Sequence, residues 1–292
     1  MNTTQFICLN GQKLKADQPL LMADNRAFRY GDALFETIRC IHKTPMFFED
    51  HYQRLLNGMV LLKMQSHSLA PLSFLNEQVI SLINKNRLFG DVRVRLTVFR
   101  EDGGLYTPTE NKVQYLIETS PLESHFYNLN SKGLLLGNYS DDRKSLNRFS
   151  RFKSANSLLF VMAGLYKKEN KLDEVLISND QNYIIETLAS NLFWIKDGNV
   201  YTPRRTSGCV DGVMRKQVLS VLHEQKIPIQ ETEGTSINEL LQADEIFITN
   251  AIQGMQWVVG LENKRYFCNK VKEIHRLLVE RASSYLKDFQ EN

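Results

Sequence analysis

The segment over residues 92–98 constrains the fold most, because apolar and polar side chains alternate along it. In an extended strand successive side chains point to opposite faces, so the apolar positions of this segment share one face. These positions are Val92, Val94, Leu96 and Val98. Arg93 and Arg95 fall on the other face, and the pattern predicts a half-buried strand with two cations on its wetter side.

Helical patterns accompany this strand in the first part of the chain. Apolar residues recur at helical spacing over residues 50–64 and again over 71–86, where Pro71 suits a first helical turn. Turn chemistry follows at residues 120–124, and a chain of 292 residues suits two domains of roughly 100 to 200 residues each. The predicted divisions are an N-terminal domain over residues 1–120, a linker over 121–128 and a C-terminal domain over 129–292.

The second half of the chain alternates more quickly between strand and helix. Short strand patterns lie at residues 134–138, 175–178, 183–186 and 192–196. The last of them ends in Asp197-Gly198, a favoured hairpin turn pair, and Ser236 with Glu239 matches a capping box at a helix start. A helix is expected after Lys153. The predicted fold class is therefore α/β, with helices and strands mixed in both domains.

Composition excludes several classes of protein. The 36 basic and 33 acidic residues are mixed along the chain, without the concentrated basic stripe of a nucleic-acid binder. The four cysteines form no C-x-x-C pair, which argues against a zinc site and a disulfide framework. The first five residues lack a signal-peptide pattern, and no apolar stretch approaches membrane-spanning length. We expect no metal, no nucleic acid and no membrane as partners, and a cytoplasmic location.

Lys153 and Glu186 are the pair of residues that says most about chemistry. A lysine amine can condense with an aldehyde cofactor, and a carboxylate can hold a ring nitrogen protonated. Together these are the groups that pyridoxal 5'-phosphate requires from a protein. Neither residue by itself indicates this cofactor.

A phosphate could bind at the helix start predicted after residue 211. Asp211 is a plausible N-cap there, and Gly212 lets the backbone approach a ligand closely, while the exposed N–H groups and the positive end of the helix dipole favour an anion. A plain capped helix is the alternative, since single caps are common. Arg54 lies on an amphipathic helix and could bind phosphate in a fork geometry, but a solvated arginine is the commoner case, and His51 is more often structural than catalytic.

Three arginines are candidates for binding a substrate with carboxylates. Arg93 and Arg95 share a strand face, and Arg39 ends another alternating segment, so their side chains could converge on one cavity. Pairing with acidic neighbours across the sheet is the alternative. The chain has no G-x-S-x-G elbow and no G-x-G-x-x-G fingerprint, so a serine hydrolase and a Rossmann dehydrogenase are weak hypotheses.

A resemblance to a known family rests on seven segments in order. They are residues 29–39 (RYGDALFETIR), 51–55 (HYQRL), 152–154 (FKS), 190–193 (SNLF), 201–203 (YTP), 212–215 (GVMR) and 243–250 (ADEIFITN). In this order and spacing the chain resembles the class IV aminotransferase family, which contains branched-chain and D-amino-acid aminotransferases and 4-amino-4-deoxychorismate lyases. The resemblance covers nearly the whole chain. It implies the two-domain fold type IV of pyridoxal-phosphate enzymes, with the cofactor in the cleft between the domains, and a homodimer.

The resemblance also implies roles for individual residues. Lys153 forms the internal aldimine with pyridoxal 5'-phosphate and later transfers protons, Glu186 faces the pyridine nitrogen, and Arg54 contacts the phosphate. The other implied cofactor contacts are Asn191, Gly212, Val213, Met214, Asn250 and Ala251. Those implied for the substrate, a small amine or amino acid, are Glu36, Arg39, Arg93 and Arg95.

The reaction is harder to choose, because lyases and aminotransferases share this machinery. Residues 191–194, 201–204, 210–215, 241–245 and 249–251 look more like the lyases, including Ala251 where aminotransferases often carry a small polar residue. The loop 100–108 lacks the arginine and histidine pair of D-amino-acid aminotransferases. The favoured hypothesis is a 4-amino-4-deoxychorismate lyase of folate biosynthesis, which forms 4-aminobenzoate and pyruvate. A branched-chain aminotransferase is the alternative, and a non-catalytic relative is a remote one.

Overall fold

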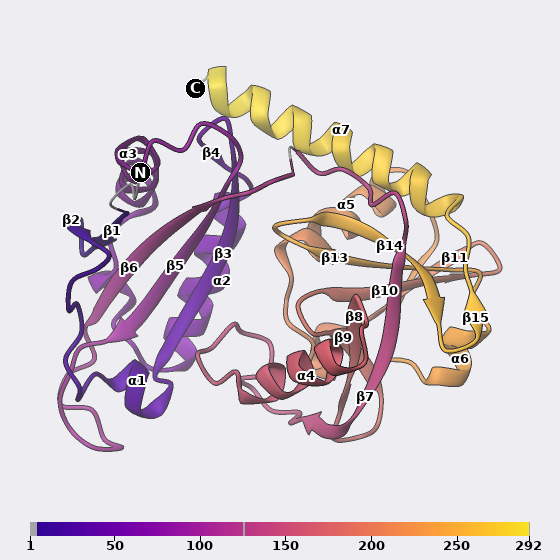
Figure 1. The fold of residues 1–292 in the computed structure, drawn as a ribbon, viewed down its shortest axis with the longest axis horizontal. Helices are drawn as coiled ribbons and strands as arrows, with labels where there is room; N and C mark the ends of the chain where they lie inside the picture. Colours follow the sequence, from indigo (N-terminus) through magenta and orange to yellow (C-terminus); the bar gives the residue numbers. More distant parts are fainter. Residues whose placement is uncertain (1–4, 125, 292) are drawn as a thin grey trace. The chain divides into compact units, whose positions relative to one another are not determined.

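The computed structural model describes residues 5–124 and 126–291 (Figure 1). Residues 1–4, 125 and 292, which belong to the predicted N-terminal domain, linker and C-terminal domain, lie outside the described part. The chain divides into two compact units. One unit runs to Phe126 and also includes residues 152–156 and the chain from Tyr285 onward; the other comprises Tyr127–Arg151 and Ser157–Ser284. The predicted domain limits at 121–128 stay a prediction.

The first unit is built on a six-stranded sheet with the order β2-β1-β6-β5-β3-β4. Its strands are β1 (Phe6–Leu9), β2 (Gln12–Lys15), β3 (Ala33–Ile41), β4 (Thr44–Pro45), β5 (Val92–Arg100) and β6 (Val113–Pro121). Its helices are α1 (Arg26–Tyr30), α2 (Phe48–Leu61), the 3-10 turn η1 (Ser66–Ser68) and α3 (Leu72–Lys85). All neighbouring strands of this sheet are antiparallel.

The strand predicted from residues 92–98 is confirmed as β5, at the centre of this sheet. Val94, Leu96 and Val98 are buried in the core that α2 and α3 complete, whereas Arg93 is exposed. Both predicted helices are confirmed, with Pro71 as the N-cap of α3, one position before its first turn. Alternation therefore identified both the strand and the face that the helices cover.

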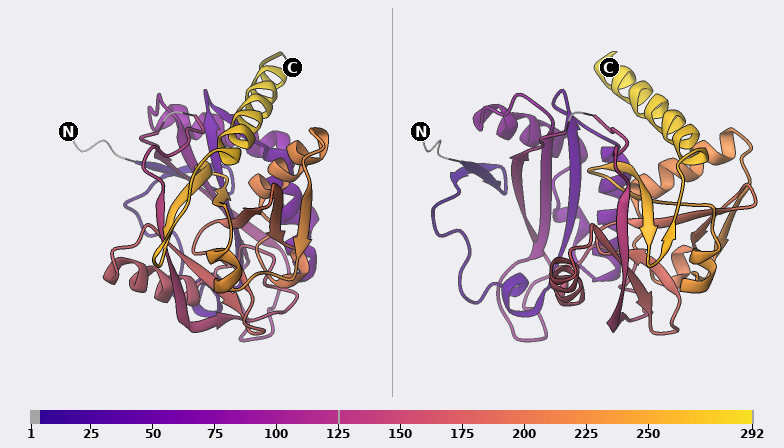
Figure 2. Two further views of the ribbon diagram at one scale, coloured as in Figure 1. Left: turned by 90° about the vertical axis from the view of Figure 1, so that its right-hand side faces the viewer. Right: turned by 45° about the vertical axis from the view of Figure 1, so that its right-hand side comes forward.

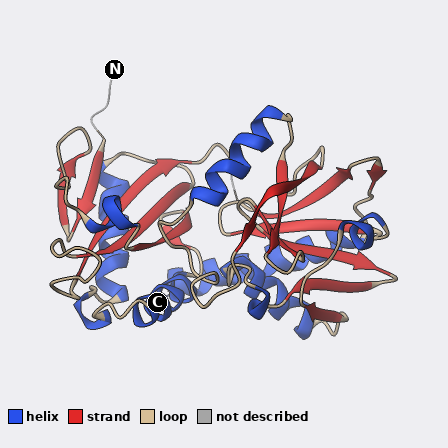
Figure 3. Ribbon diagram, turned by 90° about the horizontal axis from the view of Figure 1, so that it is seen from below, coloured by secondary structure: helices blue, strands red, loops and turns tan. Residues whose placement is uncertain are grey.

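The second unit contains a nine-stranded sheet with the order β12-β11-β10-β13-β14-β7-β8-β9, and β15 pairs with β14. Its strands are β7 (Leu134–Lys144), β8 (Glu174–Asn179), β9 (Ile184–Thr187), β10 (Asn191–Lys196), β11 (Asn199–Pro203), β12 (Ile229–Thr232), β13 (Glu245–Asn250), β14 (Gly254–Leu261) and β15 (Lys264–Arg265). Its helical elements are α4 (Leu158–Glu169), η2 (Arg205–Ser207), α5 (Val213–Glu224), α6 (Ile237–Leu241) and α7 (Lys270–Glu291), of which α7 counts in this unit as far as Ser284. Figures 2 and 3 show these elements from further sides.

β9, the last strand in this order, also pairs with β10, which lies further inside the sheet. Asn191 of β10 is the cross-strand partner of Glu186 on one side and of Thr249 on the other. Three strands therefore bring these side chains to one place, although they are far apart in sequence.

Local predictions for the second unit are mostly confirmed. The turn at Asp197-Gly198 joins β10 to β11, with positive φ at both positions as a two-residue hairpin requires. The capping box at Ser236 and Glu239 is present at the start of α6. The helix expected after Lys153 begins at Leu158, and the strand predicted at residues 134–138 continues to Lys144. Of the described helices, none is long and apolar enough to cross a membrane.

Candidate active site

Glu186 on β9 is a buried carboxylate of the second unit. Glu186 is 2% exposed, and each of its carboxylate oxygens has a hydrogen-bond partner. Oε1 lies 2.5 Å from Nζ of Lys144, and Oε2 accepts the backbone N–H of Val210 at 2.7 Å. A buried carboxylate with a cation on one oxygen and a backbone donor on the other is held in one orientation. Such a group is suited to binding a cationic ring nitrogen.

Lys144 is the residue that the sequence did not reveal. It follows Arg143 in a polar stretch that resembles a solvated surface, yet it is only 8% exposed. The extension of β7 beyond residue 138 carries it inside, where it becomes the strand partner of Asn179. A polar strand end with a lysine at its last position is the only sequence signal for it, and it is a weak one.

Asn191 holds the loop that leads to α5. Its Nδ2 donates to the carbonyl of Val210 at 2.8 Å, and its Oδ1 lies where a Cβ on Gly212 would have to be. Gly212 has an ordinary φ of −70°, so space and not backbone conformation requires glycine there. The backbone of residues 210–212 is thus held directly against the amide of Asn191.

The start of α5 is the structural candidate for phosphate binding. Gly212 is its N-cap, and no described side chain caps it. The prediction that Asp211 is the N-cap is wrong, because the helix begins one residue later and Asp211 Oδ2 lies 3.3 Å from Nη1 of Arg205. Val213 and Met214 are the first two residues of the helix, and their N–H groups lie next to Gly212. The helix dipole favours an anion at this end. Gly212, Val213 and Met214 are therefore grouped at one helix end, whereas Arg54, the other predicted phosphate contact, lies on α2 of the first unit.

The end of β13 adds polar groups beside Asn191. Thr249 is its cross-strand partner, and the buried Thr249 hydroxyl has no hydrogen-bond partner among the described residues. Asn250 donates to Oγ of Ser190 at 2.9 Å, and its Oδ1 accepts the backbone N–H groups of residues 252 and 253. A buried hydroxyl without a partner is costly unless a ligand completes it. This cluster therefore fits a bound oxygen-rich group.

In the first unit, Glu36, His51 and Arg54 form a buried charged network. Nε of Arg54 donates to Oε1 of Glu36 at 2.8 Å, Nη2 of Arg54 contacts Oε2, and Nδ1 of His51 lies 2.6 Å from Oε2. Burial opposes ionisation of Glu36, but the Arg54 guanidinium and the His51 contact together lower its pKa to about 2. Burial lowers the pKa of His51, against the opposing effect of Glu36. Glu36 thus fixes the orientation of the Arg54 fork.

Lys153 is held against β3 by backbone hydrogen bonds. Its carbonyl accepts the N–H of Phe35 at 2.8 Å, and the N–H of Ala155 donates to Ala33 at 3.0 Å. Nζ of Lys153 lies 4.8 Å from the centre of the Phe35 ring, and the Arg95 guanidinium carbon lies 3.8 Å from the centre of the same ring. The lysine and one predicted substrate arginine are therefore neighbours of one aromatic side chain.

The other two predicted arginines lie elsewhere on the sheet. Arg93 is exposed, and it is the cross-strand partner of Arg39. Arg39 is 1% exposed and binds Oδ2 of Asp91 through Nε at 2.9 Å and Nη2 at 2.6 Å. The substrate roles of Glu36, Arg39, Arg93 and Arg95 stay predictions, as does the expectation that Lys153 of the first unit and Glu186 of the second line one cavity.

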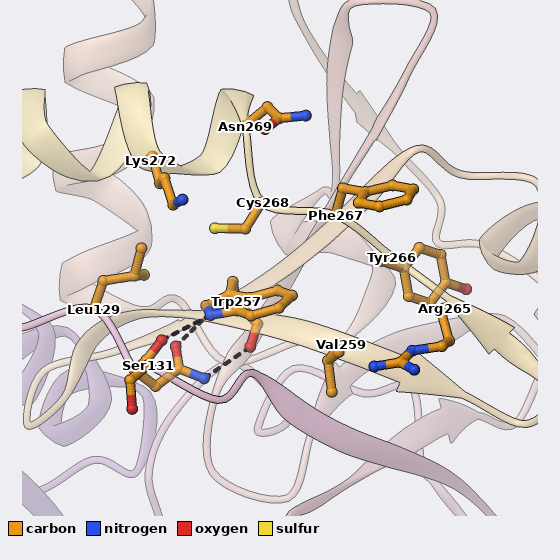
Figure 4. Close-up of a pocket in the computed structure, with 11 residues that line it drawn as sticks. Leu129, Ser131, Trp257, Val259, Arg265, Tyr266, Phe267, Cys268, Asn269 and Lys272 are labelled. Atoms are coloured by element: carbon orange, nitrogen blue, oxygen red, sulfur yellow. Dashed lines mark hydrogen bonds between the residues drawn. The ribbon is translucent and has the colours of Figure 1, made fainter.

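A surface cavity of about 790 Å³ lies in the second unit, away from the residues predicted to bind cofactor or substrate. Trp257, Phe267 and Tyr266 are among its lining residues, with Arg265 and Lys272 at its sides (Figure 4). None of the predicted site residues lines it. Its size alone therefore does not make it the catalytic site.

Comparison with known proteins identifies the family. The sequence pattern described as amino-transferase class IV matches residues 33–260. The chain is 26% identical to a probable branched-chain-amino-acid aminotransferase of Aquifex aeolicus, over 94% of this chain and 90% of that protein. It is 27% identical to an aminodeoxychorismate lyase of Vibrio harveyi, over 82% of this chain and 88% of that protein.

Solved structures agree with this assignment. The branched-chain aminotransferase of Thermoproteus uzoniensis superposes with a TM-score of 0.85 at 19% identity, covering 98% of both chains. A putative 4-amino-4-deoxychorismate lyase of Legionella pneumophila superposes with a TM-score of 0.81 at 25% identity, covering 91% of this chain and 97% of the other.

The chain therefore belongs to the class IV aminotransferase family, and it is an enzyme of this pyridoxal-phosphate-dependent class. The predicted family, fold class and enzyme class are confirmed. Branched-chain aminotransferases and aminodeoxychorismate lyases match it at similar identity, so family membership alone does not select the reaction.

Proposed function

We propose that this enzyme binds pyridoxal 5'-phosphate and acts as a 4-amino-4-deoxychorismate lyase, releasing pyruvate and 4-aminobenzoate. The observation that carries the cofactor assignment is the cluster around Asn191. Glu186, the uncapped start of α5 at Gly212 and the unsatisfied hydroxyl of Thr249 are joined there by strand register and by hydrogen bonds to the loop at Val210. A ring nitrogen, a phosphate and a further polar oxygen are the groups this donor set fits.

Individual residues would divide the work as follows. Glu186 would accept a hydrogen bond from the ring nitrogen, while the N–H groups of Val213 and Met214 and the Arg54 guanidinium would hold the phosphate. When bound, the cofactor withdraws electrons from the carbon that carries the substrate nitrogen. Lys153 would then take a proton at its Nζ, which requires a neutral amine. Nζ of Lys153 and the Arg95 guanidinium both contact the Phe35 ring.

The lyase is favoured over the aminotransferase by sequence likeness, because the segments from residue 191 to 215 and Ala251 look more like the lyases. Arg95, partly exposed beside Phe35, is a candidate to bind a substrate carboxylate near Lys153. Aminodeoxychorismate and a branched-chain amino acid both carry such a carboxylate, so Arg95 is compatible with either reaction.

A direct comparison of substrates tests the proposal. Purified holoenzyme is supplied with aminodeoxychorismate, with pyruvate and 4-aminobenzoate as readouts, and in parallel with leucine, isoleucine or valine plus 2-oxoglutarate. We expect kcat/KM for pyruvate release to exceed that for transamination, with Lys153→Ala inactive in both assays as the control. Efficient leucine transamination without detectable 4-aminobenzoate would reject the lyase in favour of the aminotransferase.

We also propose that the enzyme is a cytoplasmic homodimer. Support comes from α4, where apolar side chains at helical spacing are exposed to solvent: Leu158 (74%), Val161 (55%), Met162 (43%) and Leu165 (48%). A continuous apolar stripe of this kind on a surface helix usually marks a contact between proteins. A second copy of the chain is the occupant that the family resemblance implies. The four buried cysteines, all unpaired, suit a reducing compartment.

A further inference from the structure

Lys144 and Glu186 form the most enclosed ion pair among the described residues of the second unit, with side chains 10% and 3% exposed. The groups that face this pair come from α4 and from the loop before α5. Phe160 of α4 lies under the Lys144 ammonium at 5.5 Å, Val210 supplies its backbone N–H to Glu186, and the thiol of Cys209 interacts electrostatically with both charges. Burial and the Glu186 charge raise the pKa of Cys209 to about 11, so the thiol stays neutral near pH 7. Lys144 is thus a cation in direct contact with Glu186.

The position of Lys144 affects where a shared proton would reside. A proton between Glu186 and a ring nitrogen can lie on the nitrogen, which leaves two charges, or on the carboxyl, which leaves none. Burial favours the uncharged arrangement. A cation 2.5 Å from Oε1 stabilises the ionised carboxylate directly, and so opposes that tendency.

We propose that Lys144 is a positioning residue for the cofactor ring: it holds Glu186 ionised and oriented, so that the shared proton stays on the ring nitrogen. This inference rests on the proposed function of Glu186. Each carboxylate oxygen still has a lone pair for a further donor, because Lys144 occupies one site on Oε1 and Val210 one on Oε2. The ion pair and the ring contact are therefore compatible.

A purely structural ion pair is the alternative, and it predicts different results. A structural pair would stabilise the fold in the absence of cofactor and leave the ring nitrogen unaffected when cofactor is present. The proposed role requires the charge of Lys144 to influence the ring itself. The decisive readout is therefore the protonation state of the ring nitrogen, and not the melting temperature or activity.

The test uses the full-length enzyme loaded with pyridoxal 5'-phosphate labelled with ¹⁵N in the ring. The ¹⁵N chemical shift at pH 7 reports whether the nitrogen is protonated, and the infrared carbonyl band of a protonated carboxyl reports the complementary state. We expect the ratio of ring-protonated to carboxyl-protonated forms to fall about tenfold or more in Lys144→Met, the change that corresponds to one pH unit of differential stabilisation. Lys144→Arg should retain the wild-type shift.

Two further variants make the outcome decisive. Lys144→Gln keeps a hydrogen-bond donor without the charge, so it should behave like Lys144→Met if the charge is responsible, and it replaces Lys144→Met if that variant fails to fold. Lys168→Met removes an exposed lysine of α4 and should match wild type. Wild-type shifts in Lys144→Met or Lys144→Gln would overturn the proposal, even if these variants were less stable.

A last variant distinguishes the proposed role of Lys144 from the proposed role of Glu186 as the partner of the ring nitrogen. Glu186→Gln should move the ring ¹⁵N shift towards the unprotonated value. If it did not, Glu186 would not be the partner of the ring, and both proposals would fail. If Glu186→Gln moved the shift but the neutral Lys144 variants did not, only the role of Lys144 would be rejected.

Discussion

At the scale of single residues, Lys144 and Lys153 have different surroundings, although they are close in sequence. The Lys144 ammonium lies 2.5 Å from Oε1 of the buried Glu186 carboxylate. Nζ of Lys153 lies over the Phe35 ring, which also contacts the Arg95 guanidinium. Only a neutral amine can attack an aldehyde. The proposed function assigns that nucleophilic role to Lys153 and the role of counter-ion to Lys144.

Lys153→Ala is expected to abolish the visible absorbance of bound pyridoxal phosphate and all catalysis, while the circular dichroism spectrum stays that of wild type. The lysine is a covalent attachment point, and its backbone hydrogen bonds to β3 survive truncation of the side chain. Borohydride reduction of the holoenzyme followed by peptide mapping should place the cofactor on Lys153. Label on Lys144 would contradict the assignment.

The sequence indicates candidate residues that stand in recognisable segments. It misses residues that strand register brings to the site. Lys153, Glu186 and Gly212 stand in recognisable segments, and the comparisons confirm the family to which those segments belong. Lys144 stands in a polar stretch, and only the pairing of β7, β8 and β9 brings it to Glu186. Asp211 was misassigned as a cap because a helix start is uncertain by a residue without its geometry.

At the scale of elements, the start of α5 shows how a loop and a strand position the first N–H groups of a helix. Asn191 of β10 holds the carbonyl of Val210 and fills the space beside Gly212. The helix can then present its first N–H groups without a side-chain cap. Any group larger than hydrogen at Gly212 would push the loop away from β10 and misalign those donors.

Gly212→Ala is accordingly expected to raise the dissociation constant of pyridoxal phosphate by about tenfold or more, because the added Cβ would collide with Asn191 and misplace a charge-assisted contact. Gly164→Ala is the matched control. It lies within α4, and its nearest neighbour would be 3.9 Å from the new Cβ, so it should leave cofactor affinity unchanged and stabilise the helix by up to about 1 kcal/mol. Equal affinities for the two variants, from titration of the apoenzyme, would show that the α5 start does not bind phosphate.

The packing of α2 on β3 makes stability depend on pH. The pKa of His51 is lowered on folding, so the unfolded chain binds that proton more tightly, and stability is lost as pH falls below the ordinary value of 6.5. Glu36 has a folded pKa of about 2 against an ordinary value of 4.5, so its contribution is lost at lower pH, as pH falls from 4.5 towards 2.

His51→Asn should therefore remove part of the decrease in Tm between pH 7 and pH 5 that the wild-type apoenzyme shows. The asparagine amide can still donate to Glu36, but it does not titrate. Scanning calorimetry at several pH values measures the slope, with His67→Asn, in the turn η1, as a histidine control outside the network. If the dependence of Tm on pH were unchanged in His51→Asn, the lowered pKa of His51 would be contradicted.

At the scale of the whole molecule, the apolar stripe of α4 is the feature that a single chain does not explain. A helix of a monomer usually turns its apolar face inward, whereas the buried residue of α4 is Ala163 and the larger apolar side chains point to solvent. The sequence pattern alone predicted a helix there, but it could not show which face the sheet would cover. The packing of α4 in the folded chain shows that its larger apolar side chains lie on the solvent side.

Val161→Glu is expected to convert the proposed dimer into a monomer, because a charge would be buried in an apolar contact. Val161 is 55% exposed, so the substitution should leave the fold of the single chain intact. Light scattering coupled to size exclusion gives the mass, with the surface change Lys168→Gln on the same helix, of equal change in charge, as control. A dimer that persists in Val161→Glu would place the subunit contact elsewhere.

The five residues around Lys153 have a consequence for how such a gene can evolve. They belong to the first unit and lie along β3, yet the chain on both sides of them belongs to the second unit. Recombination between relatives at residues 121–128 would therefore combine the reactive lysine of one parent with the supporting strand of the other. Because the first unit draws residues 152–156 from the far side of that point, such a recombinant would have to fit two parental sequences together within one unit.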